Sequence, residues 1–165
     1  MLIGVVGKSG SGKSTISRIF KSYDQSIQII EVDKIGHESH KDTFVKKELL
    51  NVFKEEIFNQ DFSVNRKKLS SIVFNDKEKM NKLCNITLEF MEKKIDSLLN
   101  KSDITILDYA LLTKLKYFKM CDIKILVVSS YDIRSSRVRK RDNITTKKYD
   151  EIEANSLEYM VEDFD

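Results

Sequence analysis

The sequence predicts a three-layer α/β domain built around a mainly parallel β-sheet. Apolar runs of strand length alternate with segments whose apolar residues recur at helical spacing, which is typical of strand, helix, strand units. The first apolar run ends in a glycine-rich segment, GKSGSGKS at residues 7–14. Of the 165 residues, 41% are hydrophobic and 33% are charged, so we expect a chain that folds as one domain.

Four compact apolar runs are predicted to be strands, because runs of this length suit strands buried on both faces of a parallel sheet. They are residues 2–6, 26–32, 103–112 and 122–129. A helix is predicted from Ser14 to Lys21, where Ile16, Ile19 and Phe20 fall on one side. The start of the chain therefore reads as a strand, a glycine-rich loop and a helix.

Three further helical stretches follow from apolar residues at helical spacing. One runs from Thr43 to Phe58, with Asp42 as its N-cap. A second region, 66–100, is predicted to be interrupted near Asn75, and a last helix is expected over 145–162. We expect a single domain with a core of residues 1–41 and 101–130, a helical substrate subdomain of about 42–100, and a lid with a C-terminal helix of about 131–165.

The charge pattern argues against nucleic-acid and membrane partners. Lys and Arg number 29 against 26 Asp and Glu, and the two signs are interleaved rather than segregated. The apolar run before Gly7 is too short for a signal peptide, and Cys84 and Cys121 lie far apart without metal spacing. We therefore expect a cytoplasmic protein, a monomer, whose partner is a phosphorylated small molecule.

Residues 7–14 match the phosphate-binding pattern G-x-x-x-x-G-K-[ST] at every fixed position. Glycines let backbone amides surround phosphate oxygens, and the helix that follows adds its positive end. Lys13 can then reach the β and γ phosphates, while the Ser14 hydroxyl can ligate Mg²⁺. The alternative, a glycine-rich turn with a chance lysine, is disfavoured by the strand and helix on either side. The residues expected to bind ATP here are Lys8, Ser9, Gly10, Ser11, Gly12, Lys13, Ser14 and Thr15.

Two aspartates follow predicted strands, at the edge where open α/β sheets bind ligands. Asp108 ends the run ITILD, where a carboxylate beside the phosphate loop can hold Mg²⁺ directly or through water. Asp33 follows the second strand and can orient or deprotonate an acceptor hydroxyl near the γ phosphate. The alternative for each is a turn or cap role, since such positions favour aspartate without any ligand.

The polar stretch after Ser130 is rich in arginine and predicts a mobile cover. Arg137 and Arg141 are four residues apart, so they share a helical face and can neutralise charge on a transferring phosphoryl group. A solvated helix face remains the alternative for each arginine. His37 and His40 make only a weak metal site without a third ligand.

The chain resembles the dephospho-coenzyme A kinases, small P-loop kinases of the nucleoside-monophosphate kinase type, over nearly its whole length. The resemblance rests on IGVVGKSGSGKSTISRIF at the start, IIEVDKIG around Asp33, NRKKLSSIVFND at 65–76, LDYALL at 107–112, CDIKILVV at 121–128 and RVRKRDNIT at 137–145. It implies a three-layer P-loop NTPase fold with a four- to five-stranded, mainly parallel sheet, a helical substrate-binding insertion and a lid.

That family phosphorylates the ribose 3′-hydroxyl of dephospho-coenzyme A with Mg-ATP, the last step of coenzyme A biosynthesis. The resemblance implies that Asp33 is the acidic residue at the acceptor hydroxyl, that Arg66 belongs to the substrate region, and that Arg141 is a lid arginine. We accordingly expect catalysis by Asp33, Lys13 and Arg141, ATP binding that includes Arg137, substrate binding by Asp33, Arg66 and Asp108, and Mg²⁺ binding by Ser14 and Asp108.

Several positions depart from the family pattern. They are Lys8 in place of glycine, Asn65 in place of aspartate, Thr87 and Leu88 in place of His-Pro, 110–114 in place of Pro-Leu-Leu-x-Glu, and 151–155 in place of Arg-x-x-x-Gln. These departures keep two alternatives open: a P-loop kinase with another nucleoside or nucleotide acceptor, and an ATP-binding protein that has lost catalysis. The expected function is ATP-dependent phosphorylation of dephospho-coenzyme A.

Overall fold

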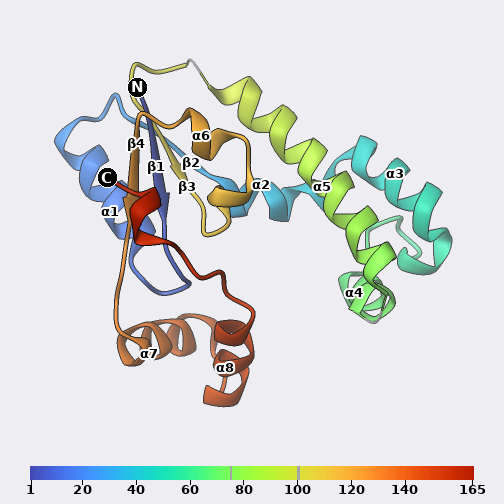
Figure 1. Ribbon diagram of the computed structural model, residues 1–165. Coiled ribbons are helices and arrows are strands. Elements are labelled where there is room, and N and C mark those ends of the chain that lie inside the picture. Colours follow the sequence, from blue (N-terminus) through green and yellow to red (C-terminus); the bar gives the residue numbers. More distant parts are fainter. Residues whose placement is uncertain (75, 100) are drawn as a thin grey trace. The chain divides into compact units, whose positions relative to one another are not determined.

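The computed structural model describes residues 1–74, 76–99 and 101–165. The chain forms two compact units, which are treated separately below (Figure 1). The sheet unit comprises Met1–Glu31 and Leu99–Asp165, and the helical unit comprises Val32–Leu98. The short helix that follows the second strand therefore groups with the helical unit. In the described ranges, no helix is both long and apolar enough to cross a membrane.

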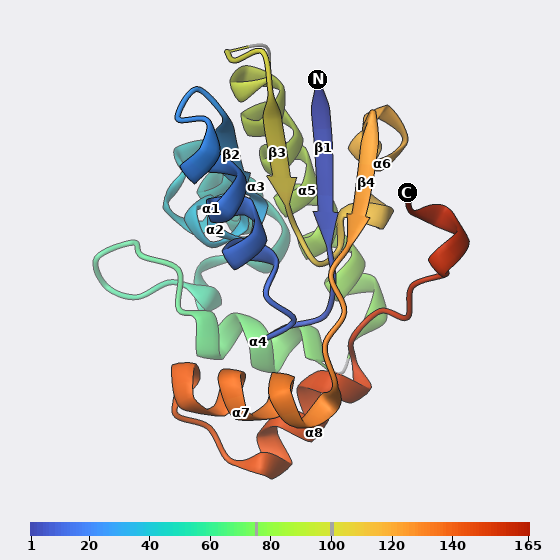
Figure 2. The same cartoon turned by 90° about the vertical axis from the view of Figure 1, so that its left-hand side faces the viewer.

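A parallel sheet of four strands forms the centre of the sheet unit, which confirms the predicted α/β class. Figure 2 shows the strands side by side in the order β2-β3-β1-β4. Central β1 pairs Val5 with Asp108 on one side and with Ile125 on the other. The strands are β1 (Leu2–Val6), β2 (Gln28–Glu31), β3 (Thr105–Asp108) and β4 (Ile123–Leu126).

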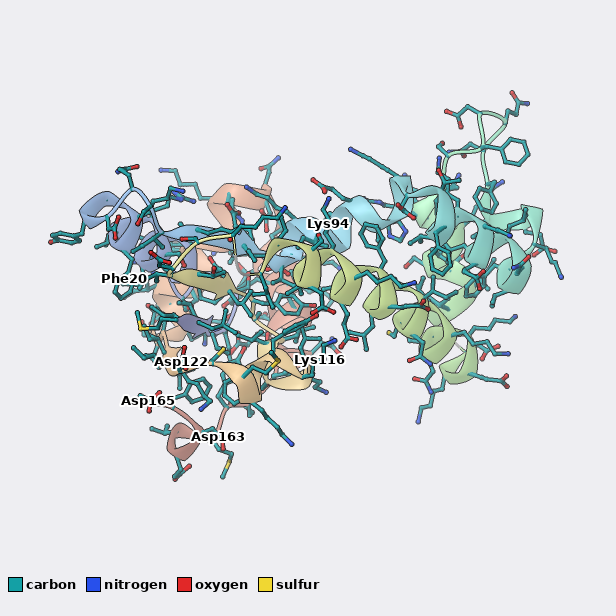
Figure 3. All side chains as sticks on the ribbon, turned by 90° about the horizontal axis from the view of Figure 1, so that it is seen from above. Phe20, Lys94, Lys116, Asp122, Asp163 and Asp165 are labelled. Atoms are coloured by element: carbon teal, nitrogen blue, oxygen red, sulfur yellow. The ribbon has the colours of Figure 1, made fainter. Side chains whose placement is uncertain are left out.

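Helical segments cover both faces of this sheet, which gives the predicted three layers. Figure 1 shows α1 (Lys13–Tyr23) on one side and α6 (Tyr117–Met120) on the other. Phe20 of α1, labelled in Figure 3, packs against a buried cluster that includes Val5 and Ile106. On the opposite face, the short η3 (Leu112–Lys114) approaches β1 so closely that a Cβ at Gly4 would lie 3.0 Å from a Leu112 methyl carbon.

The C-terminal part of the sheet unit is a pair of helices at the carboxyl ends of the strands (Figure 2). Helix α7 (Tyr131–Asp142) ends at Asn143, which adopts a left-handed conformation, and α8 (Thr146–Ala154) is capped by the Thr145 side chain. The predicted helix over 145–162 is therefore too long. The backbone leaves helical geometry at Asn155, and only the short η4 (Val161–Asp163) follows.

The helical unit is built around a buried cluster that includes Leu49, Ile57 and Leu69. Asp42 caps α3 as predicted, since its side chain accepts hydrogen bonds from the amides of Phe44 and Val45 at 2.8 and 3.1 Å. The elements of this unit are α2 (Val32–Glu38), η1 (Ser39–Lys41), α3 (Thr43–Phe53), η2 (Glu55–Ile57), α4 (Arg66–Phe74) and α5 (Lys77–Leu98).

Several predicted elements are longer than the observed ones. The predicted helix 43–58 stops at Phe53, because Lys54 takes a positive φ of 59° that breaks the helical path. Three strands are shorter than predicted, because only four residues of each pair with a neighbouring strand. Their predicted ranges are 26–32, 103–112 and 122–129. The predicted interruption of the 66–100 region falls between α4 and α5, and Asn75 itself lies outside the described residues.

Candidate nucleotide site

The glycine-rich loop joins β1 to α1, as predicted, and it is held closely from two sides. A Cβ on Gly7 would lie 2.4 Å from the Val127 carbonyl oxygen, just beyond β4. A Cβ on Gly10, whose φ is +81°, would lie 2.7 Å from the Arg134 carbonyl oxygen of α7. Only glycine satisfies both the backbone angle and the close approach. The loop is therefore packed between the sheet and α7.

A cavity of about 310 Å³ opens at this loop. It is lined by Gly10, Gly12, Lys13, Ser14, Thr15, Arg18, Arg137 and Arg141. Four of these side chains are cationic, and within the described part of the chain no acidic residue lines the cavity. The start of α1 adds the partial positive charge of a helix N-terminus. Glycine backbone, helix end and cations together suit a phosphate chain.

The first turn of α1 presents the polar groups that the sequence motif predicts. Thr15 donates its amide to the Gly12 carbonyl at 3.0 Å, which fixes the start of the helix. Lys13 places its ammonium 3.5 Å from the Lys8 carbonyl oxygen, so its side chain folds back along the loop. The hydroxyl-bearing residues Ser14 and Thr15 line the cavity beside it. The predicted Lys13 and Ser14 thus occur together at one cavity.

Asp108 is a buried carboxylate, 3% exposed, at the end of β3. Its backbone lies in register with Val5 of β1, two residues before the glycine-rich loop begins. The Ser17 hydroxyl of α1 lies 3.4 Å from one Asp108 carboxylate oxygen and 3.1 Å from the Lys13 carbonyl oxygen. An acidic oxygen near the first turns of α1 is the kind of ligand that Mg²⁺ prefers.

Helix α7 contributes arginines with two different sets of partners. Arg137 donates from one guanidinium nitrogen to the carbonyls of Gly10 and Ser11, at 3.1 and 3.3 Å. Arg141 forms a two-point ion pair with its neighbour Asp142, at 2.7 and 2.8 Å. This pairing lowers the pKa of Asp142. Both arginines line the cavity. Their contact with a nucleotide phosphate stays a prediction.

The side chain of Lys8 is directed toward α8 and the segment after it. Its ammonium lies 3.1 Å from a Glu153 carboxylate oxygen and 2.5 Å from one of Glu158. Hydrogen bonds to these carboxylates raise the pKa of Lys8, the Glu158 contact contributing most. The Lys8 backbone still belongs to the loop, since its carbonyl accepts from the Ser11 amide at 3.1 Å. Lys8 is not among the lining residues of the cavity in the described part of the chain.

The remaining predicted residues belong to the helical unit. Asp33 is exposed in the first turn of α2, directly after β2 in the chain. Arg66 begins α4 and donates to the His37 carbonyl at the end of α2, at 3.0 Å. Partial burial, with the nearby Arg66 charge, lowers the pKa of His40. Among the described residues, no group of three or more His, Cys, Asp or Glu side chains is placed to hold a metal.

Three contributors to this region did not emerge from sequence reasoning as site residues. Arg18 lines the cavity, and its position four residues after Ser14 on one helix would have indicated it. Ser17 contacts Asp108 from the same helix. Glu153 accepts from Arg134 and from Lys8, and the pairing with Lys8 spans 145 residues, which no local pattern reveals.

Comparison with known proteins agrees with this geometry. The family model for dephospho-CoA kinase matches residues 1–159. A dephospho-CoA kinase from Fusobacterium nucleatum is 31% identical over 165 residues, covering 95% of this chain and 81% of that protein. A second, from Aquifex aeolicus, is 32% identical over 143 residues, covering 84% of this chain and 72% of the relative.

Solved structures share the fold. The crystal structure of TT1252 from Thermus thermophilus aligns with a TM-score of 0.81 at 21% identity, covering 95% of this chain and 80% of that one. Dephospho-CoA kinase from Campylobacter jejuni aligns with a TM-score of 0.61 at 22% identity, covering 93% and 79%. The sheet unit thus has a P-loop NTPase fold. With a phosphate loop, a matching family model and these relatives, the chain belongs to the dephospho-CoA kinase family.

Proposed function

We propose that the protein transfers the γ-phosphoryl group of ATP to the ribose 3′-hydroxyl of dephospho-coenzyme A, yielding coenzyme A and ADP. Family membership supports the reaction. The observation that carries it is the cavity on the glycine-rich loop, whose lining combines a helix N-terminus with Lys13, Arg18, Arg137 and Arg141. Such a lining binds the triphosphate and neutralises charge that develops as the phosphoryl group moves.

Binding of the triphosphate is assigned to the loop amides and to Lys13. Mg²⁺, when bound, would supply positive charge that stabilises the transferring phosphoryl group. The Ser14 hydroxyl and the buried Asp108 carboxylate supply oxygen ligands of the type that this ion takes. Arg141 is the last of the ATP-binding groups: its guanidinium leaves Asp142 and binds phosphate oxygens when ATP is present.

The acceptor is assigned to residues of the helical unit. Asp33 orients the 3′-hydroxyl and accepts its proton as the new P–O bond forms. Its exposure at the start of α2 leaves the carboxylate accessible to a ligand. Arg66 supports the acceptor end by holding the last turn of α2 through the His37 carbonyl. We further propose that the protein acts as a monomer in the cytoplasm, where reducing conditions suit the free thiols of Cys84 and Cys121.

A coupled ADP-release assay with Mg-ATP and dephospho-coenzyme A tests this function. We expect ADP only when the acceptor is present, with coenzyme A confirmed by mass. Asp33→Asn should abolish most turnover and leave Mg-ATP affinity unchanged, and Asp61→Asn, an exposed carboxylate elsewhere in the helical unit, serves as the matched control. Turnover of a nucleoside or nucleotide in place of dephospho-coenzyme A, or ATP binding without any transfer, would contradict the proposed reaction.

A further inference from the structure

Glu153 of α8 connects three parts of the sheet unit: the glycine-rich loop, α7 and α8. Its carboxylate accepts from the Lys8 ammonium of the glycine-rich loop at 3.1 Å. It also forms a two-point ion pair with the Arg134 guanidinium of α7 and lies 3.3 Å from the Tyr149 hydroxyl. Only 20% of the Glu153 side chain and 9% of the Arg134 side chain are exposed. The junction is therefore largely shielded from water.

Arg134 connects this junction to Gly10, a residue that lines the nucleotide cavity. Its Nε donates to the Ser129 carbonyl at 3.0 Å, and one of its terminal nitrogens donates to the Tyr149 hydroxyl at 3.0 Å. Its own carbonyl oxygen lies 2.7 Å from where a Cβ of Gly10 would be, so the backbone of α7 packs directly on the loop. Arg137 follows three residues later on the same helix face and donates to Gly10 and Ser11.

We propose that Glu153 is a positioning residue for nucleotide binding, which clamps α7 and α8 to the glycine-rich loop through Arg134 and Lys8 and thereby holds Arg137 at the phosphate cavity. This inference rests on the proposed function only in taking the cavity as the ATP site. It also assigns Lys8 a role: the loop lysine is the anchor of the clamp on the loop side and does not contact phosphate.

Two observations favour an anchoring role for Lys8 over direct phosphate binding. The ammonium is occupied by two carboxylates, and the lysine is not among the described residues that line the cavity. Of those carboxylates, Glu153 is the one that also pairs with Arg134 of α7. The Glu158 side chain is 86% exposed, so water screens its contact with Lys8. The clamp is thus centred on Glu153.

The test measures Mg-ATP binding by calorimetry, without an acceptor, for the full chain and its variants. We expect Glu153→Gln to raise the Kd about tenfold, and Lys8→Met to raise it several-fold, the size typical for members of one ion-pair network. In an Arg137→Ala background the same changes should raise the Kd by less than about twofold, because the residue they position is gone. Glu151→Gln, which breaks an exposed pair with Lys148 on the same helix, is the matched control and should bind like wild type.

Steady-state kinetics and a conservative variant separate positioning from general loss of structure. Glu153→Gln should raise the KM for ATP more than it lowers kcat at saturating ATP, and Glu153→Asp, which keeps the charge, should recover part of the affinity. If Glu153→Gln does not fold, Lys8→Met in the two backgrounds decides the question, because it removes the contact on the loop side and leaves the Glu153 pair with Arg134 in place.

Three results would overturn the clamp. One is tighter ATP binding by Glu153→Gln, which would mean that the carboxylate only withholds Lys8 from phosphate. Another is an equal loss in the presence and absence of Arg137. The third is wild-type affinity in both Glu153→Gln and Lys8→Met. A wild-type protein that binds Mg-ATP in these titrations but does not phosphorylate dephospho-coenzyme A would contradict the proposed acceptor and leave the clamp standing.

Discussion

The guanidinium of Arg137 lies 3.1 Å from the carbonyl oxygen of Gly10, so a helix near the end of the chain binds the backbone of the loop near its start. A phosphate loop needs its amides free to face the ligand. Arg137 contacts the carbonyls of that loop and also lines the cavity. One side chain can therefore support the loop and meet the ligand.

Arg137→Ala should raise the Kd for Mg-ATP about tenfold to a hundredfold, because hydrogen bonds from a charged donor are lost together with a cation at the phosphates. Isothermal titration would measure the change. Arg139→Ala is the control, since this exposed arginine of the same helix is not among the cavity residues. Equal losses in the two variants would point to a general charge effect and refute the specific role of Arg137.

Lys13→Met should lower kcat at least about a hundredfold, because the ammonium stabilises charge that develops in the transition state. Its melting temperature should change by less than about 3 °C, since the lysine is not part of the core. The coupled ADP assay and thermal unfolding test both statements, with the exposed Lys119→Met of α6 as control. Normal turnover by Lys13→Met would exclude the proposed phosphate contact.

Gly10→Ala should destabilise the protein by about 1–3 kcal/mol, because the residue has a positive φ and a Cβ would press on the Arg134 carbonyl. It should also weaken ATP binding. The matched change is Gly36→Ala in α2, where the nearest atom is the flexible Met91 sulfur at 3.4 Å and helix propensity favours alanine by up to about 1 kcal/mol. Urea unfolding of both variants provides the comparison, and equal effects would be inconsistent with this account.

Acidification should weaken the sheet unit through Glu153. The ion pairs, chiefly with Arg134, lower the pKa of Glu153 from 4.5 to about 2. A carboxyl whose folded pKa is depressed contributes its full stability above the unfolded pKa and loses it as the pH falls toward the folded value. Urea unfolding between about pH 5.5 and pH 3 should thus show a steeper loss for wild type than for Glu153→Gln.

Glu151→Gln is the control for that titration, because the Glu151 carboxylate is half exposed in its pair with Lys148 and water screens it. Its unfolding free energy should follow the wild-type pH curve. Parallel curves for wild type and Glu153→Gln would show that this carboxyl does not titrate differently in the folded state.

Local sequence patterns were sufficient to predict the sheet, the glycine-rich loop and the polar residues next to them in the chain. The strand before Gly7, the helix after it and the cap at Asp42 follow from apolar periodicity and residue type, and each is present. Periodicity alone extends α8 past its observed end at Ala154. The place of Glu153 depends on a contact with Lys8, 145 residues away in the sequence, which periodicity does not encode. Asp33 and Arg66 remain predictions as acceptor residues.

The buried thiol of Cys121 gives the molecule an internal reporter. Its sulfur packs against Gly4 of the central strand and lies 3.2 Å from the Tyr117 carbonyl, and burial raises its pKa to about 11. The thiolate that reacts with alkylating reagents is therefore scarce until the sheet opens. Cys84 is exposed on α5 and reacts without such opening. The rate at which Cys121 becomes alkylated therefore measures how often the sheet opens, and no cysteine has to be introduced for this measurement.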